Sequence, residues 1–229
     1  MRHHLQRHLL AALPWLLLLA SLHAQAHPHA WIDLRVSLEW VAEQSQGPPT
    51  RLVMHQEWWL DPTYSLLILE DFEREQPGLD LEQALDQLGQ DLLERLAHYA
   101  YFTELRANEQ PLPIPQAQAP ELTLEQRRLR LRFSLPVAWP ENQQPDHTRV
   151  DYRVYDPSYW IEVLHDPYDV IHVVTPPTLG LNCAASIAPP RPDPALVMYA
   201  ATLLRDQRAP IDDLGRPFAE VVTLTCSGS

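Results

Sequence analysis

The chain has 229 residues, of which 45% are hydrophobic, so it is long enough for one domain with a substantial core. Its 30 acidic residues outnumber 17 basic ones, and every one of those basic residues is an arginine. The absence of lysine excludes P-loop nucleotide binding and Schiff-base chemistry, and the acidic balance argues against a nucleic-acid partner.

Residues 1–26 have the layout of a secretory signal peptide. Two arginines precede an apolar run over residues 9–22, and small residues two positions apart follow it. A membrane anchor is the alternative, but the run contains Pro14 and is shorter than the roughly 20 residues of a spanning helix. We therefore expect cleavage after Ala26, leaving residues 27–229 as a single exported domain with no membrane span.

The first half of this domain shows two strands followed by two helices. Apolar and polar residues alternate over 31–41 and 51–60, which predicts two strands paired as an antiparallel hairpin. Asp61 and Pro62 fit the cap and first turn of a helix that runs to about Phe72. A second, amphipathic helix is indicated by one stripe of leucines: Leu81, Leu85, Leu88, Leu92 and Leu96.

The second half returns to the period of two that is typical of strands. Alternating glutamates at 121–125 and arginines at 128–132 predict a hairpin whose opposite charges pair across the strands, with an anion-binding arginine stripe as the alternative. Further strands are expected over 148–155, 159–164, 170–175 and 218–225, together with a helix over 194–208. Strands dominate and helices do not alternate with them, so the fold class is α+β with mostly antiparallel sheet.

Cys183 and Cys226 are the only cysteines in the sequence. An even number of cysteines in an exported protein favours a disulfide. A thiolate metal site is disfavoured because neither cysteine has a histidine or another cysteine within a few residues.

The predicted mature N-terminus places histidines next to the first strand. If the strand phase extends back to the terminus, then His27, His29, Trp31 and Asp33 share the face opposite the core. Imidazoles and a carboxylate are ligand types that zinc, nickel or copper prefer, and the free amine of His27 could chelate one ion together with its ring. The alternative is that these terminal histidines are merely solvated.

The tetrapeptide Asp-Pro-Thr/Ser-Tyr occurs twice, beginning at Asp61 and at Asp156. The simplest interpretation is that each aspartate caps a turn whose first dihedral angle is fixed by proline. The sharper hypothesis is that one of these aspartates completes a site with the N-terminal histidines. His165 and His172 lie seven residues apart around a proline turn, and their spacing does not decide whether they face each other.

Several segments together resemble a family of bacterial periplasmic proteins of unknown function. The family is labelled as a transport-system periplasmic component and includes ZevA-like zinc-uptake accessory proteins. The resemblance covers nearly all of the mature chain and is carried by residues 27–33, 59–65, 69–71, 101–103, 133–136 and 154–159 and by the two cysteine regions. It implies a periplasmic protein that handles metal beside a nickel/cobalt-type inner-membrane permease.

These observations lead to one main hypothesis and two alternatives. The main hypothesis is a non-enzymatic accessory protein that binds zinc, or else nickel, cobalt or copper, and presents it to the permease. Its ligands would be His27 and His29, completed from among Asp33, Asp61 and Asp156. The alternatives are a copper enzyme that uses the N-terminal histidine and a non-metal interaction module that contacts a transport system.

Overall fold

The computed structural model describes residues 27–43, 48–169, 171–204, 207 and 209–228. The predicted signal peptide lies outside these residues. The described residues contain three α-helices: α2 (Pro62–Glu75), α3 (Leu81–Ala97) and α4 (Pro194–Ala200). Their eleven strands are β1 (Ala30–Val41), β2 (Arg51–Leu60), β3 (Thr103–Ala107), β4 (Gln110–Pro111), β5 (Gln118–Glu125), β6 (Arg128–Ala138), β7 (Val150–Val154), β8 (Ile161–His165), β9 (His172–Val174), β10 (Leu181–Ala188) and β11 (Val221–Gly228).

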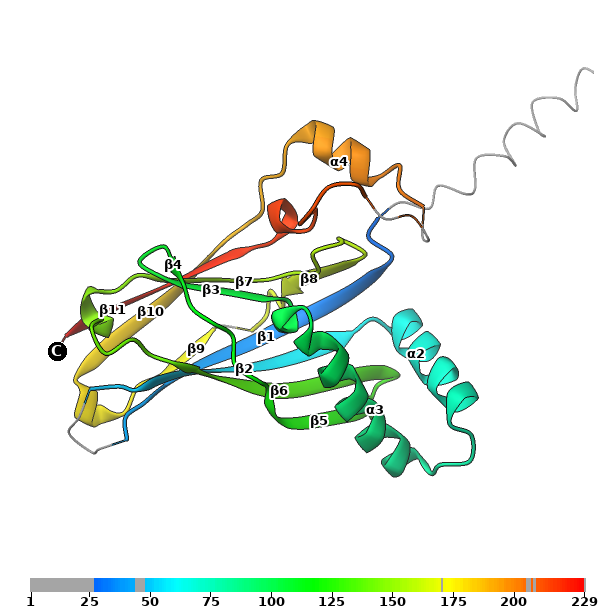
Figure 1. Cartoon of the computed structure of the whole chain (residues 1–229), viewed down its shortest axis with the longest axis horizontal. Coiled ribbons are helices and arrows are strands. Elements are labelled where there is room, and N and C mark those ends of the chain that lie inside the picture. The colour runs from blue at the N-terminus through cyan, green and yellow to red at the C-terminus, as the bar shows by residue number, and fades with distance from the viewer. Residues whose placement is uncertain (1–26, 44–47, 170, 205–206, 208, 229) are drawn as a thin grey trace, which may run out of the picture.

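The strands form two sheets, which confirms the α+β class with mostly antiparallel pairing (Figure 1). Sheet A has the order β5-β6-β2-β1-β8, with β9 also paired to β1, and sheet B has the order β10-β11-β7-β3-β4. The predicted β1–β2 hairpin is present. The exceptions to antiparallel pairing are β8 and β9, which both run parallel to β1.

One core joins the two sheets and the first two helices. Alternate residues of β1, β2 and β6 point inward, and they pack with side chains from α2, α3, β3, β7 and β11 in one hydrophobic cluster. A second, smaller cluster contains Tyr159, Ala200, Leu203, Leu214 and Phe218, and it anchors the segment around α4. Within the described part of the chain, no helix is long and apolar enough to cross a membrane.

The outer face of sheet A carries the predicted charge pairing. Glu121 lies opposite Arg132, and the two form an ion pair. Arg130 pairs with Glu125 at 2.9 Å, whereas Arg128 instead contacts Asp33 of β1 at 2.7 Å. The arginine row is therefore neutralised by carboxylates rather than available to an anion.

The helices follow the expected order but differ in detail. α2 begins at the predicted cap and extends to Glu75, beyond the expected end at Phe72. In α3 the leucine stripe is rotated: Leu81 is 57% exposed while Leu93 is buried, because the helix packs Gly89 against Leu122 of β5.

The helix predicted over 194–208 is shorter than expected, since α4 ends at Ala200. The Thr202 hydroxyl donates to the carbonyl oxygen of Tyr199 at 2.7 Å, a local hydrogen bond of the kind that competes with continued helix. Residues 205, 206 and 208 of the predicted helix lie outside the described residues.

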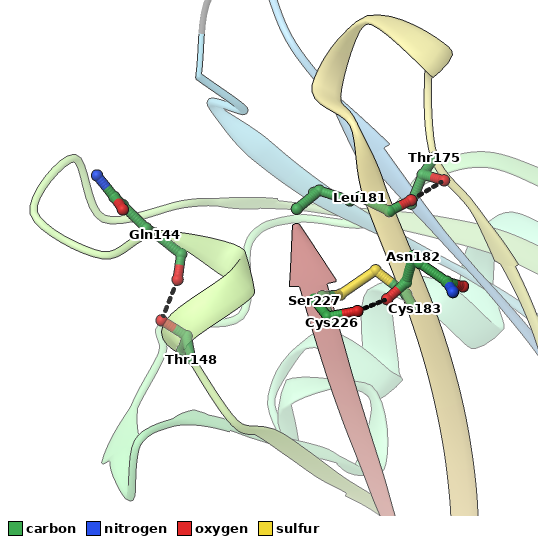
Figure 2. Close-up of a disulfide and its surroundings, with 8 residues drawn as sticks. All are labelled: Gln144, Thr148, Thr175, Leu181, Asn182, Cys183, Cys226 and Ser227. Carbon is green, nitrogen blue, oxygen red and sulfur yellow. Dashed lines mark hydrogen bonds between the residues drawn. A yellow bond between two sulfur atoms is a disulfide. The ribbon is translucent and has the colours of Figure 1, made fainter. Parts of the chain in front are cut away.

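The predicted disulfide joins Cys183 of β10 to Cys226 of β11, which are direct partners in the antiparallel ladder (Figure 2). Hydrogen bonds on either side secure the same edge of sheet B. Ser227 Oγ donates to Asn182 O at 3.5 Å, and Thr175 Oγ1 donates to Leu181 O at 3.3 Å. The disulfide therefore ties β11, the last strand, to its neighbour β10.

Replacing both cysteines with alanine is expected to lower the free energy of unfolding by about 2–4 kcal/mol, because the disulfide spans 43 positions of the chain. Urea unfolding of the oxidised protein and of the double variant measures the difference. Reduced wild-type protein is the control and should unfold like the variant. Equal midpoints for the oxidised protein and the variant would contradict the prediction.

Candidate functional site

The ends of three elements meet where β1 begins. Parallel pairing aligns Ala30 with Ile161, and the amide of His29 donates to the carbonyl oxygen of Trp160 at 2.8 Å. The amide of Trp31 donates to Asp61 Oδ2 at 3.0 Å, while the amide of Asp61 donates to Trp31 O at 2.9 Å. These bonds place the predicted N-terminal histidines between the start of α2 and the turn that leads into β8.

The two histidines form the centre of this site. Their ring centroids lie 4.7 Å apart in an edge-to-face arrangement, and the ring of His29 lies 5.6 Å from that of Trp160. The strand begins only at Ala30, and His27 is 7% exposed. The extended strand phase predicted that His27 would share the exposed face of Trp31 and Asp33. This prediction is wrong, because His27 precedes the strand and is buried.

Burial sets the ionisation of His27. Desolvation lowers the pKa of its imidazole, and this effect outweighs a hydrogen bond to the backbone of Leu203 and the nearby Asp156 carboxylate, which both raise the pKa. Nδ1 of His27 is buried without a hydrogen-bond partner. Because the neutral imidazole is the form that binds a metal ion, this ring has the ionisation state that a ligand needs.

The two aspartates of the repeated tetrapeptide act as caps. Asp61 Oδ1 accepts from the amides of Thr63 and Tyr64, at the beginning of α2. Asp156 is 7% exposed, and its carboxylate accepts hydrogen bonds from Ser158 and, at 3.0 Å, from the amide of Ile161. The Asp156 carboxylate contributes negative charge near His27, and both aspartates hold the backbone that surrounds the histidines.

Asp33 points away from this arrangement. It lies on the outer face of sheet A, where its carboxylate forms the ion pair with Arg128. Arg128 also donates to the carbonyl oxygens of Leu60 and Trp59 and so links the ends of β2 and β6. Asp33 therefore takes part in strand packing on the other side of the sheet from the core.

Tyr64 is a component of the site that the sequence analysis did not single out. Its ring lies 5.5 Å from that of Trp160, which in turn neighbours His29. Burial raises the pKa of Tyr64 to about 12, and the carboxylates of Asp156 and Asp61 add to the effect. The phenol therefore stays protonated next to the two turns. Its place as the fourth residue of the first tetrapeptide was the available signal.

Gly215 and Leu203 also belong to the surroundings of the site. A Cβ atom on Gly215 would lie 1.9 Å from the carbonyl oxygen of Asp156, so this position accepts no side chain without displacing the turn. Both residues come from the segment that follows α4, far from the histidines in sequence. No local pattern connects them to the N-terminus, and only the tertiary packing reveals the contact.

His165 and His172, whose spacing left open whether they face each other, have separate contacts. His165 Nδ1 lies 2.7 Å from Glu220 Oε2, and its Nε2 lies 3.0 Å from the hydroxyl of Tyr152, so it joins sheet A to sheet B. His172 is exposed and lies 3.6 Å from Asp169. The two do not form a common site.

The site offers two neighbouring imidazoles, with carboxylates in the surrounding turns. Among the described residues, no group of three or more histidine, cysteine, aspartate or glutamate side chains converges to hold a metal ion. The orphaned Nδ1 of His27 nevertheless fits a metal ligand, and His29 lies beside it. Such a pair would leave coordination positions for water or for a group from another molecule.

Comparison with known proteins gives the family but no activity. Residues 12–226 match the family described as "Protein of unknown function (DUF1007)", and the chain belongs to this family. It is 22% identical over 201 residues to an uncharacterized protein of Haemophilus influenzae, an alignment that covers 88% of this chain and 91% of the relative. No solved structure matches the chain.

Substitution of Gly215 tests the packing around the site. Gly215→Ala is expected to destabilise the protein by about 1–3 kcal/mol, because the added methyl group collides with the backbone of Asp156. Gly228→Ala is the matched control, since its Cβ would lie 3.5 Å from the nearest atom. Urea unfolding measures both. Equal stability of the two variants would show that the segment after α4 does not pack closely against the turn at Asp156.

The environment of His27 predicts its titration. In a chain that keeps at least one residue before His27, its imidazole should titrate below the ordinary value of 6.5, because burial disfavours the charged ring. Asp156→Asn should lower the midpoint further by removing a charge that favours protonation. Imidazole NMR signals followed against pH measure both midpoints. A His27 midpoint above 6.5 would refute the buried neutral ring.

Proposed function

We propose that the protein is a periplasmic accessory protein that binds a transition-metal ion, zinc in the first place, and presents it to an inner-membrane metal permease. Its role is to carry an ion rather than to catalyse a reaction. The observation that carries the proposal is the juxtaposition of His27 and His29, with the Nδ1 atom of His27 buried and lacking a hydrogen-bond partner.

Two properties of the site support a carrier. The depressed pKa of His27 keeps its imidazole neutral, which is the form that binds a metal. The carboxylates of Asp61 and Asp156 accept backbone hydrogen bonds, so they add negative charge near the ion without coordinating it. The ion is therefore incompletely coordinated by the protein. A site with two protein ligands releases its ion more readily than a closed structural site with four.

The charge of the molecule is consistent with the same role. Removal of the predicted signal peptide would take away Arg2 and Arg7, so 15 basic residues (17 − 2) would face all 30 acidic ones. The resulting negative field concentrates cations around the protein without selecting one. Selection among zinc, nickel, cobalt and copper would rest on the imidazoles.

A copper-dependent enzyme is the second candidate, and it is favoured by the predicted cleavage of the signal peptide. Cleavage after Ala26 would free the amine of His27 beside its own imidazole and next to His29. The amine and the two rings could then hold one copper ion. This alternative depends on the free terminus, whereas a two-imidazole zinc site does not.

Zinc titration of protein that begins at His27 tests the proposal. Isothermal titration calorimetry should show one zinc ion bound, and His27→Ala or His29→Ala should each weaken binding at least about tenfold by removing a ligand. His98→Ala is the matched control, because His98 is exposed and lies at the end of α3. Absence of binding at micromolar free zinc, or equal loss in the control, would contradict the proposal.

A chain with one extra residue before His27 separates the two candidates. It should keep its zinc affinity if the imidazoles alone hold the ion, and it should lose tight copper binding if the amine is required. If the double variant His27→Ala/His29→Ala supported full metal transport in cells, both metal candidates would fail in favour of a non-metal interaction module.

A further inference from the structure

An apolar groove lies between α2 and α3, with the inner face of sheet A as its floor. Its volume is about 340 Å³. Trp58 and Leu131 are floor residues, while Ile68 of α2 and Leu92 of α3 stand on opposite walls. Figure 1 shows both helices over the same part of sheet A, away from α4. The groove touches the surroundings of the histidine site only through Tyr64 and Ile161, and neither His27 nor His29 lines it.

One end of the groove is shaped by an unusual backbone turn. Ala100, Tyr101 and Phe102 have φ values of 50°, 53° and 57°, a left-handed conformation that L-residues disfavour. The turn stacks the ring of Phe102 on Trp58, with centroids 5.7 Å apart. It is held by Thr103, whose hydroxyl donates to Tyr101 O at 2.9 Å. These contacts shape the end wall of the groove.

The rim of the groove is acidic. Asp71 and Glu75 stand on the α2 side and Asp91 on the α3 side, with Arg95 as the one cation that lines the groove in the described structure. Asp71 also pairs with Arg74 at 2.7 Å, whereas Glu75 and Asp91 form no ion pair with another residue that the structure describes. An apolar cleft bordered by carboxylates matches an occupant that is apolar on one side and positively charged on its flanks.

We propose that this groove binds an amphipathic, positively charged helix of a partner protein. Leucine-type side chains of the partner would enter between Ile68 and Leu92, and its lysines or arginines would reach Glu75 and Asp91. This is the general mode in which the apolar face of a helix lies in a hydrophobic groove. The proposal stands on the groove alone and does not depend on metal binding.

The charge and shape of the groove favour this occupant over two others. A membrane surface is flat and, where anionic, attracts basic residues, whereas this site is concave and acidic. A second copy of the chain would bring a like acidic rim against Glu75 and Asp91, and equal charges repel. A cationic helix meets neither obstacle.

Fluorescence anisotropy with a labelled synthetic helix tests the proposal. The probe carries leucine along one face and lysine along the other, and a second probe carries glutamate in place of lysine. The lysine probe should bind and the glutamate probe should not. Ile68→Gln and Leu92→Gln should each weaken binding about tenfold, because each removes one buried aliphatic contact. Leu66→Gln is the matched control: Leu66 is 52% exposed on α2 and does not line the groove.

Charge variants test the rim without disturbing the core. Glu75→Gln combined with Asp91→Asn should weaken binding about threefold or more and reduce its dependence on salt concentration. The control combines Glu70→Gln with Asp86→Asn, two exposed carboxylates that do not line the groove. Because these variants alter surface residues, they remain informative even if Leu92→Gln fails to fold.

Three results would overturn the proposal. The first is absence of probe binding, and the second is an equal loss in groove and control variants. The third is that the lysine probe does not bind, while the protein binds anionic vesicles or forms a dimer and Leu92→Gln abolishes that association. Zinc affinity should be unchanged in every groove variant, so failure of this proposal is distinguishable from failure of the metal site.

Discussion

Parallel pairing between β1 and β8 is the constraint on which the candidate site depends. It aligns Ala30 with Ile161 and so brings the histidines before β1 against the turn before β8, two segments far apart in the sequence. A slip of one residue in β1 would exchange its inner and outer faces, moving Asp33 into the core and Ile32 out of it. The alternation that makes β1 a good strand therefore also fixes where His27 and His29 lie.

Sheet A, which contains β1 and β8, has two chemically different faces. Its inner face is apolar but contains Gln56, which is 2% exposed and fully engaged: its amide donates to Thr103 Oγ1 at 2.8 Å, and its carbonyl oxygen accepts from Trp58. This buried chain links sheet A to sheet B, as does the contact of His165 with Tyr152. Such bonds add directional links to an otherwise apolar core, because leaving any partner unpaired would cost about 1–3 kcal/mol.

Local patterns allowed much of the fold to be predicted. Strict alternation located β1 and β2, and Asp61 followed by proline located the beginning of α2, because these features depend on neighbouring residues only. The strands that became β8 and β9 were predicted, but their parallel pairing with β1 was not, because it depends on a distant partner, as does the rotated leucine stripe of α3. For the site, sequence indicated the histidines and the Asp156 turn. It missed Tyr64, for which the repeated tetrapeptide was the available signal, and it missed Leu203 and Gly215, whose roles arise only from packing.

The proposed function requires that His27 and His29 hold one metal ion beside the Asp156 turn. The most direct measurement is anomalous diffraction at the zinc edge from crystals of protein that begins at His27. The account predicts one zinc peak within bonding distance, about 2.0–2.1 Å, of a nitrogen of each imidazole. A zinc ion bound elsewhere, or imidazoles that remain uncoordinated when zinc is in excess, would contradict it.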